Sequence, residues 1–236
     1  MTQQKLKPGD LHPRAYVGPP DQYDYMGATQ FCLLAALGLR SKHHVLDFGC
    51  GSLRAGRLLL AYLQPGHYFG IDPNKWLIQS AISEDLGEEL IKLRKPRFDY
   101  NAQFQFDVFD TRFDFIVLQS ILSHTGADLL DLALSNAGSA MHEKTLLLVT
   151  VIHQEQASAN MPSGKAVMGW NYPGCVWYSR DGFSQFAMAK GFFTQELPWH
   201  HPRQTWWLLS HSEANLLNQK ALNRLSGFTV QNANHS

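Results

Sequence analysis

The sequence contains little cysteine and no excess of charge of either sign. Its three cysteines, Cys32, Cys50 and Cys175, are widely spaced and form no CxxC pair, so they predict neither a disulfide scaffold nor a zinc site. Twenty basic and twenty acidic side chains cancel, and no basic stripe runs along the chain. Because nucleic-acid binders depend on such stripes to neutralise phosphates, we expect a small-molecule substrate rather than DNA or RNA.

Long apolar runs are also missing. The amino-terminal residues MTQQKLKPGD lack the apolar core of a signal peptide, and no apolar stretch approaches the length of a membrane span. His200 and His201 stand beside Pro202 without a third ligand at metal spacing, so we expect no metal site. These absences predict a cytoplasmic protein that has no membrane partner and no metal.

The 236 residues are 44% apolar and 17% charged, as expected for one globular α/β domain with some additions. Residues 1–27, which include Tyr16, Tyr23 and Tyr25, are rich in proline, glycine and tyrosine and read as an extended arm. Such an arm could be a flexible tail, a lid over a ligand or a contact in a homodimer. Residues 28–210 would form the main domain, and residues 211–236 a polar tail with a short helix and a disordered end.

Apolar segments alternate in type along the main domain. We expect strands at 43–49, 67–72, 104–109, 113–120, 145–153, 192–199 and 204–210, and helices at 28–39, 53–63, 74–93, 127–141 and 179–191. Alternating strands and helices imply a mostly parallel sheet with helices on both faces. The last two strands are joined by only four residues, HHPR, so they must pair antiparallel. The predicted fold is Rossmann-like α/β, with a seven-stranded, mostly parallel sheet and an antiparallel carboxy-terminal hairpin.

The strongest motif is VLDFGCGS at 45–52, between a buried strand and a helix. Gly49 and Gly51 allow a tight turn and a close approach of the backbone to a ligand at a helix amino terminus. A dinucleotide fingerprint would have a third glycine where this chain has Arg54. Asp47, two residues before the first glycine, is typical of a cradle for S-adenosylmethionine (SAM).

A second carboxylate, Asp72, ends the next predicted strand about twenty residues after the turn. In that position it can accept hydrogen bonds from both hydroxyls of an adenosine ribose, which SAM and nicotinamide cofactors share. The missing third glycine and the antiparallel ending favour SAM.

Three segments, VLDFGCGSLRAGRLL, YFGIDPNKWLI and FDFIVLQSILSHTG, resemble motifs of bacterial class I SAM-dependent methyltransferases of the small-molecule type. The resemblance extends over roughly residues 15–210. It implies that Gly49 and Gly51 approach the methionyl moiety and that Asp72 holds the ribose. It also implies that Asp107, ending the third strand, faces the adenine amino group while Val108 or Phe109 packs on the ring. Gln119 and Ser120, ending the fourth strand, would face the sulfonium and the acceptor.

Two histidines are candidate general bases, because neutral imidazole titrates near physiological pH. His124 follows the fourth strand in SILSHTG, and His153 ends the fifth. Each could instead be an ordinary loop or capping residue, just as Asp107 could be a simple turn residue.

The insert at about 154–180 is expected to cap the substrate. It carries the aromatic side chains of Trp170, Tyr172, Trp177 and Tyr178 together with Asn171. Aromatic faces attract a sulfonium or an ammonium, although the same side chains could form an ordinary core cap. Trp206 and Trp207 are adjacent on the last strand, so we expect one to face inward and the other outward.

Three functions are compatible with these residues. The first is methyl transfer from SAM to a small-molecule nucleophile, in which the enzyme aligns the acceptor and excludes water. The second rests on the YVGPP, SILSHTG and YPGCVWY segments, which also resemble azetidine-2-carboxylate synthases of the same fold. There the amine of SAM closes a ring on its own γ-carbon, and Tyr16, Asn136, Asn171 or the insert's aromatic residues could assist. The third is a non-catalytic regulatory protein that binds SAM.

Overall fold

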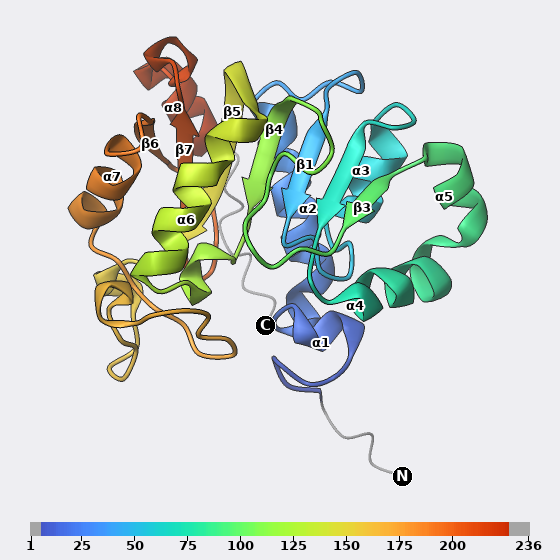
Figure 1. Cartoon of the computed structure of the whole chain (residues 1–236), viewed down its shortest axis with the longest axis horizontal. Helices are drawn as coiled ribbons and strands as arrows, with labels where there is room; N and C mark the ends of the chain where they lie inside the picture. Colours follow the sequence, from blue (N-terminus) through green and yellow to red (C-terminus); the bar gives the residue numbers. More distant parts are fainter. Residues whose placement is uncertain (1–5, 227–236) are drawn as a thin grey trace, which may run out of the picture. The chain divides into compact units, whose positions relative to one another are not determined.

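The structure, a computed structural model, describes residues 6–226 (Figure 1). The chain divides after Phe115 into two compact units. Within the described residues, seven strands follow the order β3-β2-β1-β4-β5-β7-β6. The pairs β1–β2 and β2–β3 are parallel, whereas β7 pairs antiparallel with both β5 and β6. This arrangement confirms the predicted Rossmann-like α/β class and its antiparallel carboxy-terminal hairpin.

The first unit contains the first three strands and the helices between them. In chain order its elements are α1 (Pro13–Tyr16), η1 (Pro20–Gln22), α2 (Tyr23–Ala36), β1 (Val45–Phe48), α3 (Gly56–Tyr62), β2 (Tyr68–Ile71), α4 (Lys75–Ser80), η2 (Ala81–Leu86), α5 (Glu88–Arg94) and β3 (Arg97–Asp99). Every residue of β1 and β2 is buried. Strands buried on both faces read as continuous apolar runs, which is why VLDF and YFGI are recognisable in the sequence.

The second unit contains the second half of β4 (Phe113–Leu118) and everything after it. The following elements are η3 (Leu122–His124), α6 (Ala127–Ala137), η4 (Gly138–Ala140), β5 (Met141–Val151), η5 (Gln154–Gln156), η6 (Gly164–Ala166), α7 (Arg180–Met188), β6 (Phe193–Leu197), β7 (Thr205–Ser210), η7 (Glu213–Asn215) and α8 (Gln219–Ser226). The insert at 154–180 has two short 3-10 turns and isolated bridges, Thr125 with Trp170, His153 with Tyr178 and Ser163 with Trp177.

The amino-terminal segment is more helical than predicted. We expected an extended arm to residue 27 and a helix from Ala28, but α2 already begins at Tyr23, and two short helical turns precede it. Each of these turns begins with a proline, Pro13 or Pro20. Proline is compatible with a first helical turn because its fixed φ suits that position. A backbone N–H at that position would have no partner within the helix, so nothing is lost by its absence. The expectation for residues 1–5 lies outside the described residues.

The strand predicted at 104–109 is absent. The third strand is β3, which lies earlier at Arg97–Asp99, and residues 104–109 form a loop in which Phe104 has φ +51°. The rings of Phe104 and Phe106 stack on Phe48, with centroids 5.2 and 4.5 Å away. The apolar alternation that suggested a strand therefore reflects loop side chains that fill the core beside β1.

The predicted helix at 74–93 is divided into α4, the π-helical η2 and α5, with Gly87 at φ +79° before α5. Strand β5 begins at Met141, four residues before the predicted start. On β7, both Trp206 and Trp207 are buried, so the expectation that one faces outward is wrong. Every residue of β7 is buried, so both faces of this strand are covered.

The expected short helix of the tail is α8, and residues 227–236 lie outside the described part of the chain. Across residues 6–226, no helix combines the length and apolar character needed to cross a membrane. The three cysteines are all free thiols.

Candidate functional site

The turn after β1 is anchored to the end of β2. Gly49 and Gly51 have φ of +78° and +53°, values that glycine adopts without the steric cost of a side chain. The backbone N–H groups of Gly49 and Cys50 both donate to the carbonyl of Ile71, at 2.7 and 3.1 Å. The glycine turn is thus held directly beside the residue that follows Ile71, which is Asp72.

Asp72 presents a buried carboxylate to this turn. Its Oδ2 accepts a hydrogen bond from the Gly51 N–H at 2.9 Å, and its Oδ1 accepts one from the Asn74 N–H at 2.8 Å. Only 6% of the residue is exposed. Burial raises the pKa of Asp72, while the bonds from Asn74 and Gly51 oppose that rise. Asn74 Nδ2 also donates to Oδ1, at 3.1 Å, so one of the about four acceptor positions of this carboxylate remains for a ligand hydroxyl.

Asp47 points into the interior below the turn. Its Oδ2 accepts a hydrogen bond from the Tyr68 hydroxyl at 3.0 Å, and its Oδ1 accepts one from Gln30 Nε2 at 3.5 Å. Burial raises the pKa of Asp47 to about 6, and the bonds from Tyr68 and Gln30 act in the opposite direction. These contacts fix Asp47 in the protein interior next to the glycine turn. Direct binding of a ligand by Asp47 stays a prediction.

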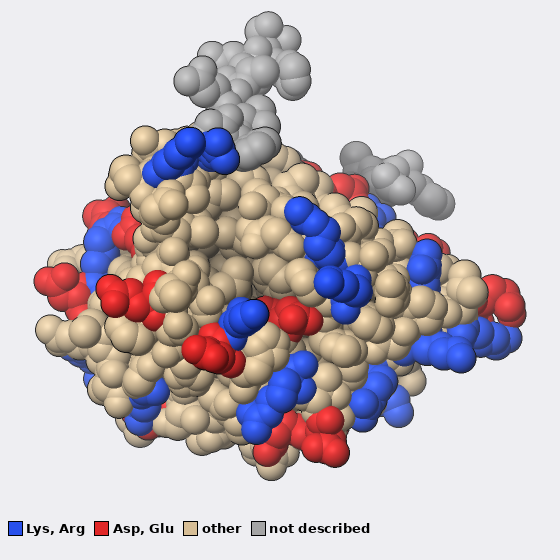
Figure 2. All heavy atoms as spheres, turned by 90° about the horizontal axis from the view of Figure 1, so that it is seen from above, with Lys and Arg blue, Asp and Glu red and all other residues tan. Residues whose placement is uncertain are grey.

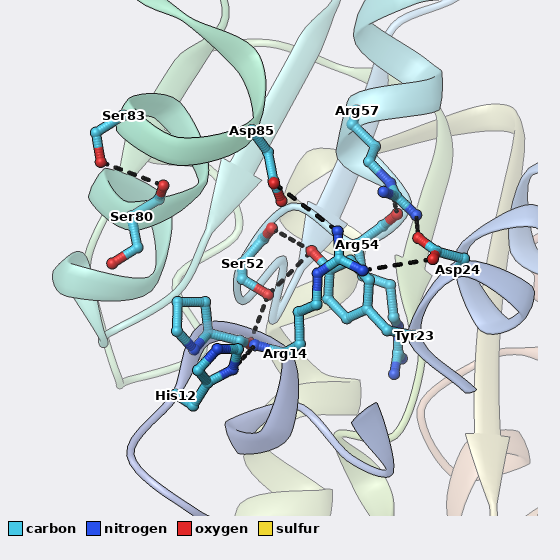
Figure 3. A network of polar contacts seen from close by, with 11 residues as sticks. His12, Arg14, Tyr23, Asp24, Ser52, Arg54, Arg57, Ser80, Ser83 and Asp85 are labelled. Atoms are coloured by element: carbon cyan, nitrogen blue, oxygen red, sulfur yellow. Dashed lines mark hydrogen bonds and ion pairs between the residues drawn. The ribbon is translucent and has the colours of Figure 1, made fainter. Parts of the chain in front are cut away.

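The amino-terminal segment contacts the residues that directly follow the glycine turn (Figure 3). Ser52 Oγ donates to the carbonyl of Pro13 at 2.8 Å, and the Tyr23 hydroxyl donates to the Ser52 carbonyl at 2.7 Å. Arg54 Nη1 donates to the carbonyl of Val17 at 3.0 Å. Sequence reasoning treated Arg54 only as a missing glycine and did not foresee this role. The predicted arm therefore contacts the glycine turn in the first unit, and its role as a lid over a ligand stays a prediction.

A charged cluster surrounds the Tyr23 side of this contact. The guanidinium groups of Arg14 and Arg57 lie 4.9 and 5.0 Å from the centre of the Tyr23 ring, and both form ion pairs with Asp24 (Figure 3). The Arg57 hydrogen bond is the main cause that lowers the pKa of Asp24. Asp24 is largely exposed, so we expect these ion pairs to contribute little stability individually.

Tyr16 ends α1 and packs edge-to-face against Trp76 of α4, with ring centres 5.3 Å apart. Trp76 follows Asp72 by four residues, so this aromatic pair lies close along the chain to the carboxylate. The roles expected of Tyr16, as part of a lid over the bound ligand and as an aid to ring closure of SAM, stay predictions.

Asp107 and Val108 do not end a strand as predicted. They lie in the loop that replaces the expected strand, and both are exposed. Phe109, the next residue, is buried against Phe69 of β2 at a centroid distance of 5.2 Å. The placement of Asp107 at a strand end is wrong, and contact of Asp107 or Val108 with an adenine ring stays a prediction.

In the second unit, Gln119 and Ser120 follow β4 as predicted. Ser120 has φ +60°, its N–H donates to Thr150 Oγ1 at 2.7 Å, and its Oγ accepts a hydrogen bond from Gln204 Nε2 at 3.1 Å. Gln119 is 6% exposed, and neither its Oε1 nor its Nε2 has a hydrogen-bond partner within the described residues. Gln204, at the start of the last strand, was not predicted, because a glutamine beside a loop has no recognisable pattern.

His124 lies in a polar and aromatic setting at the end of η3. Its Nδ1 is 2.6 Å from the carbonyl of Gly174, and the rings of Trp170 and Tyr172 lie 5.5 and 5.2 Å from the imidazole. A carbonyl can only accept, so Nδ1 carries the proton and Nε2 of the neutral ring is the acceptor. Burial lowers the pKa of His124, which favours this neutral form.

Asn171 and Tyr178 hold the insert together. The Asn171 N–H donates to the carbonyl of His124 at 2.8 Å, and its Nδ2 donates to the Cys175 carbonyl at 3.2 Å. Tyr178 is 1% exposed, and its hydroxyl donates to the carbonyl of Thr125 at 2.8 Å. Burial raises the pKa of Tyr178. Both residues therefore have structural contacts, and their catalytic roles stay predictions.

His153 is fully buried, and both of its ring nitrogens have partners. Nδ1 is 2.9 Å from the Tyr178 carbonyl, and Nε2 accepts a hydrogen bond from Trp207 Nε1 at 2.9 Å. Burial lowers the pKa of His153. A ring whose two nitrogens are both engaged has no free acceptor, so this geometry supports the capping interpretation rather than a general base.

Among residues 6–226, no group of three or more histidine, cysteine, aspartate or glutamate side chains could hold a metal ion. On the face shown in Figure 2, basic and acidic side chains are interspersed rather than gathered by sign.

Comparison with known proteins extends these observations. The model of a family described as "methyltransferase domain" matches residues 21–227. The search of curated proteins finds no match.

Many solved structures share the fold. Magnesium protoporphyrin IX methyltransferase from Synechocystis PCC 6803 with bound S-adenosylhomocysteine (SAH) has a TM-score of 0.57 at 15% identity, over 81% of this chain and 86% of that one. The glycopeptide N-methyltransferase MtfA complexed with SAM has a TM-score of 0.58 at 12% identity, over 79% and 94%. A DhpI–SAH complex has a TM-score of 0.56 at 17% identity, over 80% and 85%. At these identities the likeness establishes the fold alone.

The family match covers most of the chain and includes the glycine turn, Asp72, Gln119 and His124. It agrees with the topology and with the cradle described above. The chain therefore belongs to the methyltransferase-domain family.

Proposed function

We propose that this chain binds SAM at the glycine turn of its first unit and transfers the methyl group to a small-molecule nucleophile. The observation that carries the proposal is the buried Asp72 carboxylate, which accepts the Gly51 N–H at 2.9 Å beside a turn of two left-handed glycines. Membership of the methyltransferase-domain family supports it.

The turn leaves no room for a side chain at Gly51. A Cβ on Gly51 would lie 2.6 Å from Val17 Cγ1 and 4.0 Å from Asp72 Oδ2, so only bare backbone fits between the two. The backbone at Gly49 and Gly51 would approach the methionyl part, and Asp72 would accept hydrogen bonds from the ribose hydroxyls. When bound, SAM supplies an electrophilic methyl carbon attached to a sulfonium.

The second unit supplies residues suited to handling a nucleophile. His124 has a neutral imidazole whose Nδ1 is bonded to the Gly174 carbonyl, so Nε2 can accept a proton. Trp170 and Tyr172 lie next to this ring and offer aromatic faces to a cationic or planar group. The interspersed surface charge in Figure 2 is consistent with a small acceptor rather than a nucleic acid.

Calorimetric titration with SAH tests the cofactor site. Replacing Asp72 with alanine removes charge-assisted hydrogen bonds, which should weaken SAH binding by about 10- to 150-fold. The matched control is Asp99→Ala, because Asp99 ends the adjacent strand β3 and its carboxylate is bonded to the Asn101 N–H at 2.9 Å. Equal affinity of wild type and Asp72→Ala would contradict the ribose contact.

Product analysis tests the reaction. Protein incubated with SAM and a panel of acceptors should form SAH only when an acceptor is present. Methylthioadenosine together with azetidine-2-carboxylate, formed from SAM alone, would instead support the ring-closing reaction. SAM binding without any product across a broad panel would support a regulatory role.

A further inference from the structure

The side chain of Gln119 is buried but has no hydrogen bonds. The residue is 6% exposed, and its amide oxygen and amide nitrogen both lack a partner within the described residues. Gln204, which is 4% exposed, has an amide oxygen in the same condition. Buried polar atoms without a partner destabilise a protein, so native structures rarely keep them except where a ligand or water completes them.

Ser120 connects the two glutamines. It follows Gln119 in the chain, and its hydroxyl accepts the hydrogen bond from Gln204 Nε2 at 3.1 Å. Its backbone is in the left-handed region at φ +60°, where the bond from its N–H to Thr150 Oγ1 at 2.7 Å helps to hold it. Non-glycine residues in this conformation are strained and concentrate at functional sites. Residues Gln119, Ser120, Thr150 and Gln204 are called the amide cluster below.

The amide cluster contains no charged side chain, which limits the ligands that it can take. A carboxylate or a phosphate could pair only with the single unpaired donor, Gln119 Nε2, and the two unpaired amide oxygens would repel it. An ammonium would be buried without a counter-ion, at a large cost in desolvation. The neighbouring residue in the chain, Arg203, is exposed and positively charged, so it could not act as a counter-ion for an ammonium. The ligand group must therefore be neutral and must donate hydrogen bonds.

We propose that the amide cluster binds the neutral primary amine of the methyl acceptor, an inference that rests on the proposed function. The amine has two N–H donors, and the cluster has two unpaired amide oxygens, on Gln119 and Gln204. A hydroxyl has one donor and would leave one of these oxygens unpaired. With both N–H groups engaged, the nitrogen lone pair stays available for attack, and Gln119 Nε2 can donate to an oxygen of the same molecule.

The transfer balances without a further reactant. The amine nitrogen forms a bond to the methyl carbon as the bond from that carbon to sulfur breaks, and the electron pair of the broken bond stays on sulfur. The positive charge passes from sulfur to nitrogen. The product is a secondary ammonium, which gives up one proton to the neutral His124 imidazole, the base of the proposed function.

The test uses 2,2,2-trifluoroethylamine and 2,2,2-trifluoroethanol, which have nearly the same shape and are both neutral near pH 7.5. Binding of each to the full-length protein is followed by fluorine NMR, with and without saturating SAH. The amine should bind about tenfold more tightly than the alcohol, because the alcohol leaves one buried acceptor unpaired. Gln204→Met and Gln119→Met, which keep the side-chain length, should each weaken amine binding about tenfold and leave alcohol binding almost unchanged.

The matched control is Gln195→Met. Gln195 lies on β6, and its Nε2 donates to the carbonyl of Leu217 rather than to the amide cluster. This variant should bind the amine like the wild type. SAH affinity should be the same in Gln204→Met, Gln195→Met and the wild type, which separates a change in the amide cluster from a loss of folding or of the SAM site.

Equal binding of amine and alcohol, or no amine binding at all, would overturn the inference. Amine binding that is unchanged in both Gln204→Met and Gln119→Met would show that the cluster holds a buried water only. Failure of the wild type to bind SAH would contradict the proposed function instead, while the comparison of amine with alcohol would still decide the inference.

Discussion

Replacing Tyr68 with phenylalanine removes the main hydrogen bond of Asp47 at the base of the glycine turn. The Tyr68 hydroxyl is 3.0 Å from Asp47 Oδ2, and the two residues are 1% and 5% exposed. The other bond to this carboxylate comes from Gln30 Nε2 at 3.5 Å, a long distance for a hydrogen bond. The variant therefore leaves Asp47 buried with one weak partner.

The loss of stability depends on whether Asp47 is ionised. Burial raises its pKa from 3.8 to about 6, so the folded protein holds a carboxylate near pH 7.5 and a carboxylic acid near pH 4.5. Hydrogen bonds to charged groups contribute about 1.5–3 kcal/mol and those between neutral groups about 0.5–1.5. We expect Tyr68→Phe to lower the free energy of unfolding by about 2 kcal/mol near pH 7.5 and by about 1 kcal/mol near pH 4.5.

Proton linkage explains why the stability loss of Tyr68→Phe grows as the pH rises. A carboxyl group whose pKa is raised on folding contributes stability that is complete below its unfolded pKa and is lost as pH rises through its folded pKa. The Tyr68 hydroxyl favours the charged form, so its removal raises the folded pKa of Asp47 further above about 6. The stability of the variant consequently keeps falling to a higher pH than that of the wild type, and the gap between them widens across this range.

Urea unfolding followed by circular dichroism at the two pH values measures the effect. The matched control is Tyr62→Phe, because the Tyr62 hydroxyl donates at 3.3 Å to a neutral acceptor, the carbonyl of Leu39, and the residue is 38% exposed. Its loss should be under about 1 kcal/mol and independent of pH. A loss for Tyr68→Phe that is equal at both pH values, or larger at the lower one, would refute the reasoning.

Three further outcomes are expected. Gly51→Ala places a methyl group against the amino-terminal segment and should weaken SAH binding by calorimetry more than tenfold (about 1.4 kcal/mol), whereas Gly66→Ala, also at positive φ but with no atom within 4 Å of the added Cβ, should keep full affinity. Because burial lowers the pKa of His124, the methyl-transfer rate should fall only at pH values below the ordinary pKa of histidine. His124→Gln should remove this acidic limb of the pH–rate profile. Trp207→Phe leaves the buried Nε2 of His153 without a donor and should cost about 1–3 kcal/mol in urea unfolding, so unchanged stability would contradict its structural role.

The elements that the sequence predicts well are those with a strong local pattern. The apolar run that becomes β1 leads into two glycines and then an amphipathic helix, and each of these signals agrees with the next. Asp72 could be placed for the same reason, because it directly follows the buried run of β2. The hairpin of β6 and β7 follows from a connection too short for a parallel crossover.

Elements decided by distant contacts could not be predicted. The segment FQFDVF has the alternation of a strand, but Phe104 and Phe106 leave the backbone of a loop to stack on Phe48, more than fifty residues earlier. The site residues show the same limit. Gln119 is recognisable because it follows a strand, whereas Gln204 becomes relevant only when the fold brings it to Ser120, 84 residues away in the chain.

The amino-terminal segment shows how such distant contacts shape the cradle itself. The turn after β1 has its own glycine geometry, but three of its contacts come from the segment before α2 and the start of that helix: Pro13 to Ser52, Tyr23 to Ser52 and Val17 to Arg54. Arg54 occupies the position of the third glycine in a dinucleotide fingerprint, and its guanidinium bonds to the Val17 carbonyl. A third glycine could not make that bond. The residue that argued against a nicotinamide cofactor is therefore also one that attaches the amino-terminal segment to the cradle.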